Sequence, residues 1–63
     1  MMTKTEIIAE LRRSATEDAD PYKSCHISAW LVALDFGRSM RGSQKNNVRT
    51  FYLLVAEALE HDQ

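Results

Sequence analysis

Large apolar side chains crowd into two segments of this 63-residue chain, residues 27–40 and 48–59. In both segments they recur at spacings of three and four residues, which is the period of an α-helix. The alternating pattern that is typical of strands is absent. A chain of this length forms one domain at most, and so small a domain hides only a modest share of its surface. We therefore predict a single all-α domain that spans residues 1–63.

Capping signals and chain breaks give the helix boundaries. Thr3 and Glu6 have the spacing of a capping box, in which each side chain accepts a backbone N–H of the other residue. Gly42 suits the end of the middle helix, and Asn46 or Asn47 suits the N-cap of the last helix. The predicted helices cover residues 3–14, 27–41 and 47–61.

The segment between the first two helices, residues 15–26, is acidic and contains the only proline, Pro21. It is predicted to be a connection with room for a short helical turn at residues 22–25, because the residue before a proline avoids the α region. Ser24 or Ser28 is the expected N-cap of the middle helix. The simplest architecture is a hairpin of the second and third helices with the short first helix packed across it.

Such a hairpin carries more apolar surface than one chain of this size can hide. The first helix offers only Ile7, Ile8 and Leu11 to cover what the hairpin leaves open. Soluble monomers rarely expose a continuous apolar patch of several hundred Å2, and twofold self-association is the commonest way to cover one. We therefore predict a homodimer. The interface is expected to use a subset of Trp30, Leu34, Phe36, Met40, Phe51 and Leu54.

Nothing in the sequence indicates an enzyme, a metal site or a cofactor site. Cys25 is the only cysteine, and the adjacent His26 does not have the spacing of a zinc pair. The carboxylates fall on polar helix faces or in the connection, and no glycine-rich phosphate loop is present. We predict no catalytic residues and no cofactor. No apolar run is long enough to span a membrane and no secretory signal is evident, so we expect a cytoplasmic protein.

One local feature leaves an alternative open. Arg38, Arg41, Lys45 and Arg49 lie in a stretch without acidic residues, although the net charge of the whole chain is −1. Lysine and arginine side chains bind phosphates, and a dimer would present the stretch twice. These four residues are candidate contacts to a protein partner or to nucleic acid. The alternative function is a small DNA-binding transcriptional regulator.

The layout resembles that of a family of short phage proteins. It combines the capped start Thr3–Glu6, the tryptophan helix 27–34 and the aromatic C-terminal segment 51–59. In this it is similar to the short helical proteins that temperate lambdoid phages encode in their early regions, including the exo–xis segment. The resemblance implies a non-enzymatic accessory protein, often dimeric, that modulates a host or phage process by binding another protein. It assigns no functional residues.

Overall fold

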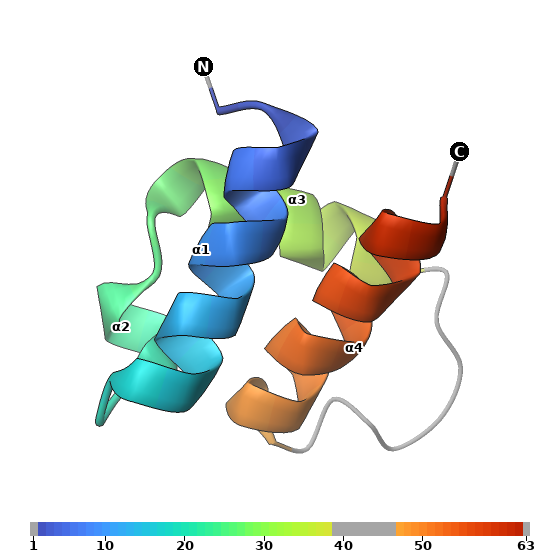
Figure 1. The fold of residues 1–63 in the computed structure, drawn as a ribbon. Helices are drawn as coiled ribbons and strands as arrows, with labels where there is room; N and C mark the ends of the chain where they lie inside the picture. Colours follow the sequence, from blue (N-terminus) through green and yellow to red (C-terminus); the bar gives the residue numbers. More distant parts are fainter. Residues whose placement is uncertain (1, 39–46, 63) are drawn as a thin grey trace.

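The computed structural model describes residues 2–38 and 47–62, and all regular structure in these residues is helical. The helices are α1 (Lys4–Glu17), α2 (Pro21–Ser24), α3 (Ile27–Gly37) and α4 (Val48–His61). This confirms the all-α class. In Figure 1, α1 and α4 lie side by side and antiparallel, α3 crosses behind them, and α2 lies beside the lower half of α1. The described chain therefore forms a small bundle around the α1–α4 pair.

Short polar side chains start α1 and α4. The predicted capping box is present at α1, where Glu6 N donates to Thr3 Oγ1 at 3.2 Å and Thr3 N donates to Glu6 Oε1 at 2.9 Å. At α4, Asn47 Oδ1 accepts hydrogen bonds from the backbone of Arg49 and Thr50. These contacts satisfy N–H groups that have no partner within the helix.

The connection between α1 and α3 differs in detail from the prediction. The first helix does not end near Ser14 but continues to Glu17, because Ser14 and Ala15 are buried. Asp20 caps the one-turn helix α2, with Pro21 at its first position. The N-cap of α3 is His26, whose Nδ1 accepts Ser28 N at 3.1 Å, and neither Ser24 nor Ser28 has that role.

The expected hairpin joins the predicted helices 27–41 and 47–61, which correspond to α3 and α4. This pair is not the main packing unit. The closest packing joins α1 to α4, whereas α3 meets each of them over a smaller area. The first helix is also not short, since α1 and α4 have 14 residues each. Both carry one amphipathic stripe, and two such stripes bury each other well. The core residues are Leu11, Ala15, Ala29, Ala33, Tyr52, Val55, Ala56 and Leu59.

A half-buried carboxylate, Glu10, ties the α2–α3 turn to α1. Glu10 Oε2 accepts the backbone N–H of His26 at 2.7 Å, and the Arg13 guanidinium donates to both Glu10 oxygens at 2.8 Å. Arg13 also donates to the carbonyl oxygen of Ser24 at 3.2 Å. This ion pair therefore fixes the position at which α3 begins.

Candidate protein interaction surface

Helix α3 packs into the fold through its smallest residues. Ala29, Ala33 and Gly37, spaced four apart, are its buried positions. Residues at this spacing form one face of a helix, and small side chains there let the backbone approach its neighbours closely. Only Ser28 and Asp35 in α3 have polar side chains. A helix that is apolar around most of its circumference is normally covered on all sides.

The opposite side of α3 carries large apolar residues that the described chain does not cover. Ile27 is 58% exposed, Leu31 53% and Leu34 38%. Their spacings of four and three residues place them on one face, which we call the outer face of α3. An isolated exposed leucine is ordinary, but a row of aliphatic residues along a helix is typical of an interaction surface.

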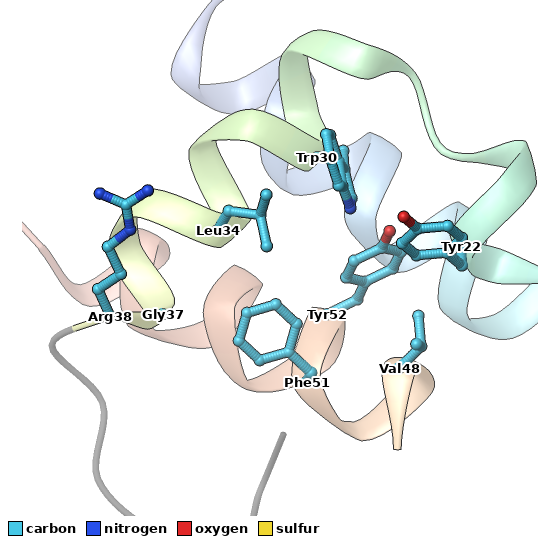
Figure 2. Close-up of a pocket in the computed structure, with 8 residues that line it drawn as sticks. All are labelled: Tyr22, Trp30, Leu34, Gly37, Arg38, Val48, Phe51 and Tyr52. Atoms are coloured by element: carbon cyan, nitrogen blue, oxygen red, sulfur yellow. The ribbon is translucent and has the colours of Figure 1, made fainter. Parts of the chain in front are cut away.

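An aromatic pocket opens beside the outer face, between α3 and the first half of α4 (Figure 2). Its volume is about 300 Å3. Tyr22 and Trp30 meet edge to face in its wall, with ring centroids 5.8 Å apart. Four of the five aromatic residues of the chain line it. The lining consists of Tyr22, Trp30, Leu34, Gly37, Arg38, Val48, Phe51 and Tyr52.

Tyr52 is the buried part of this wall. The residue is 1% exposed, and its hydroxyl has no nitrogen or oxygen hydrogen-bond partner among the described residues; its polar neighbour is the Cys25 thiol, a weak hydrogen-bonding group. Burial, together with the neighbouring Cys25, raises the pKa of Tyr52 well above its ordinary value. The ring therefore serves the packing of α4, and its hydroxyl stays neutral.

The structure brings only some of the predicted interface residues to this surface. Leu34 belongs to the outer face, and Trp30 and Phe51 line the pocket. Phe36 is half-buried and packs against the core, and Leu54 is half-buried on α4. Met40 lies outside the described residues.

Three exposed residues at this surface were not among the predicted interface residues: Tyr22, Ile27 and Leu31. The spacing of Ile27 and Leu31 on α3 was visible in the sequence. Spacing alone, however, does not say which side of an almost wholly apolar helix points inward. The burial of Ala29 and Ala33 decides this, because small residues permit close helix packing.

The predicted basic contacts do not form one group among the described residues. Arg49 is turned into the fold, where its guanidinium donates to the carbonyl oxygens of Ala15 at 2.7 Å and Ala19 at 2.9 Å. Arg38 is exposed at the rim of the aromatic pocket. Arg41 and Lys45 lie outside the described residues. One of the four predicted cations is thus engaged at the C-terminal end of α1.

Two reactive side chains of the described chain, Cys25 and Glu10, are held in structural contacts. Burial raises the pKa of the Cys25 thiol, which keeps it protonated at neutral pH and weakens it as a nucleophile. The two hydrogen bonds from Arg13 lower the pKa of Glu10 to about 2, so this carboxylate is a poor proton acceptor. The apolar surface on α3 is therefore the best candidate functional site.

Comparisons of the chain with protein-family models, curated proteins and solved structures found no match. None of the helices in the described part of the chain has the length and apolar character needed to cross a membrane.

Proposed function

We propose that this chain is a small non-enzymatic accessory protein that self-associates through the outer face of α3 and acts by binding another protein. The observation that carries the proposal is the row Ile27, Leu31 and Leu34, whose side chains are 58%, 53% and 38% exposed. Burying one large apolar side chain stabilises a complex by about 1.5–3 kcal/mol. A few such residues match the entire stability of a small domain, about 5–15 kcal/mol.

The residue types at the aromatic pocket also support a protein interface. Tryptophan, tyrosine and arginine are the side chains that most often dominate binding energy at protein interfaces, usually in well-packed pockets. Trp30, Tyr22 and Arg38 line this pocket together. The resemblance to accessory proteins of lambdoid phages fits the same function, since those proteins act through protein contacts.

Nucleic-acid binding is less well supported. Phosphate contacts need cations that face solvent, and the Arg49 guanidinium is engaged by two backbone carbonyl groups. A salt series with duplex DNA separates the two functions, because phosphate contacts make affinity fall steeply with salt. The proposal predicts no measurable binding at 50 mM salt.

The chain offers a matched pair of variants to test the surface. Leu31→Glu places a charge on the outer face of α3. Leu53→Glu places the same charge on α4, where Leu53 is 40% exposed. Thr50, Glu57 and Glu60, at helical spacing from Leu53, are all exposed, so Leu53 lies on a polar face.

Sedimentation velocity over a concentration series measures the effect of both substitutions. We expect Leu31→Glu to abolish self-association and Leu53→Glu to leave it within twofold of the unmodified chain. Circular dichroism confirms that both variants keep their helices. Equal effects of the two substitutions would contradict the assignment of the surface to α3.

A further inference from the structure

We propose that two copies of the chain pair antiparallel through α3, so that Ile27 of each copy fills the aromatic pocket of the other. This inference rests on the proposed self-association and adds its geometry. It concerns the outer face of α3, which consists of Ile27, Leu31 and Leu34, and the aromatic pocket beside that face.

The same helix carries both a protruding side chain and a pocket to receive it. Ile27, at the start of α3, is the most exposed large apolar residue of the described chain. Leu34 belongs both to the outer face and to the pocket lining. Seven residues separate Ile27 from Leu34, which is two helical turns or about 10 Å. A twofold axis that crosses α3 near Leu31 exchanges the two positions.

Such an arrangement is self-complementary. In an interface with twofold symmetry, each contact occurs twice, with the roles of the two copies reversed. Two Ile27 side chains would fill two pockets, and the two Leu31 side chains would meet at the axis. Each pocket has a volume of about 300 Å3, which accommodates a branched aliphatic side chain. Its walls are mainly apolar and aromatic, as Figure 2 shows.

The charges around the outer face favour antiparallel pairing. In a parallel pair, Asp35 would lie near Asp35 and Arg38 near Arg38, and like charges repel. In the antiparallel pair, Asp35 of one copy approaches the N-terminal end of the other α3, where the helix dipole attracts a carboxylate. Helix α2, which precedes α3, carries the exposed Lys23 and Asp20 3.9 Å apart, so Arg38 meets charges of both signs at that end of the other copy.

The direct test of this pairing uses the unmodified chain. A sample is prepared from equal amounts of 13C-labelled and unlabelled chain, and an isotope-filtered NOE experiment selects contacts between copies. We expect intermolecular NOEs from the Ile27 methyl groups to the ring protons of Trp30 and Phe51. Ile7 and Ile8, half-buried on α1, are internal controls that should show none.

The possible results separate this inference from the proposed function. A monomeric mass at the NMR concentration would overturn both. A dimeric mass with no intermolecular NOE from Ile27 to an aromatic ring would overturn the pairing geometry alone. Intermolecular contacts of Ile27 with Ile27 would do the same, because they indicate a parallel pair.

A double-mutant cycle gives an independent measure of the contact. We expect Ile27→Ala to raise the dimer dissociation constant at least tenfold, whereas Leu53→Ala changes it less than twofold. In a Leu34→Ala background, which opens the receiving pocket, the effect of Ile27→Ala should shrink, because contacting residues are not additive. Full additivity of the two substitutions would contradict the proposed contact.

Discussion

Gly37 of α3 lies directly against the ring of Phe51 on α4: a Cβ atom added to Gly37 would be 2.4 Å from Phe51 Cζ and 2.5 Å from Cε1. Real Cβ atoms essentially never approach another atom so closely. Glycine is therefore required at this position for the ring to keep its place. Because both residues line the aromatic pocket, this contact sets the shape of the pocket.

Gly37→Ala should change the pocket more than the fold. The added methyl group must push the Phe51 ring aside, which costs about 1–3 kcal/mol. The higher helix propensity of alanine offsets up to about 1 kcal/mol of this. We expect the free energy of unfolding to fall by about 1 kcal/mol and self-association to weaken at least fivefold. Chemical denaturation and sedimentation velocity measure the two effects.

The double variant Gly37→Ala/Phe51→Leu is the matched test of this contact. A leucine side chain is shorter than the ring and relieves the overlap with the new methyl group. Gly37→Ala should therefore be less destabilising in the Phe51→Leu background than alone. An equal loss in both backgrounds would show that the ring is not what excludes a side chain at Gly37.

Arg49 holds the end of α1 to the start of α4. Its guanidinium donates to the carbonyl oxygens of Ala15 and Ala19 at the same time. Hydrogen bonds from charged groups contribute about 1.5–3 kcal/mol when partly buried. We expect Arg49→Ala to lower the free energy of unfolding by that amount in urea denaturation. Arg49→Lys should restore little, because an ammonium group cannot reproduce the planar fork.

Arg12→Ala is the control for Arg49. Arg12 pairs with Glu60 at 3.0 Å, but both side chains are about half exposed. Ion pairs of this kind contribute about 0–1 kcal/mol. If Arg49→Ala proves no more destabilising than Arg12→Ala, the hydrogen bonds from Arg49 to the end of α1 are not important for stability.

Glu10 should make the stability of the fold depend on pH in the acid range. Hydrogen bonds from Arg13 lower its pKa from an ordinary value near 4.5 to about 2. The side chain is only 14% exposed. A depressed pKa in the folded state stabilises the fold fully above the ordinary pKa, and this contribution is lost as the pH falls toward 2.

Glu10→Gln removes this dependence. At pH 7 the variant should be less stable by about 1–3 kcal/mol, because Arg13 loses one of its two ionised partners and keeps only Asp18. Denaturation curves at pH 7, 5, 4 and 3 should show the difference from the unmodified chain shrinking below about pH 4.5. Glu57→Gln, on the exposed face of α4, should show no such trend. A difference that stays constant down to pH 3 would contradict the role of Glu10.

Tyr52→Phe should be tolerated although Tyr52 is in the core. The hydroxyl is a buried polar group with no nitrogen or oxygen partner among the described residues, so removing it gives up at most a weak contact with the Cys25 thiol. Such a group costs about 1–3 kcal/mol when it is left without a partner. We expect the free energy of unfolding to stay the same or to rise by up to about 1 kcal/mol. Clear destabilisation would show that the hydroxyl has a partner in solution.

The sequence predicted the parts of the fold that depend on local chemistry. The Thr3–Glu6 capping box and the Asn47 cap follow from neighbouring residues, and the structure shows both. It did not predict that α1 continues past Ser14. This depends on tertiary packing, because the rest of the fold buries Ser14 and Ala15. The Ser14 hydroxyl is hydrogen-bonded within α1, to Glu10 and Arg13, so a polar residue is accommodated there.

The orientation of α3 also required the structure. Apolar residues recur along residues 27–40 on more than one side of this helix, and their spacing does not say which side faces the core. Hydrophobicity alone predicts that the largest residues face the core. In the structure the small residues Ala29 and Ala33 face it, because they allow the helices to pack closely. The role of Arg49 could not be predicted from the sequence either. Its partners are backbone carbonyl groups at the end of α1, far away in the sequence, and no side-chain pattern marks them.

The solution mass shows most directly whether a second copy covers the outer face of α3. Sedimentation equilibrium of the unmodified chain at micromolar to millimolar concentrations gives this mass without reference to shape. We predict a mass that rises to twice the 7.2 kDa of one chain and does not rise further. A mass that stays at 7.2 kDa over the whole range would contradict the claim.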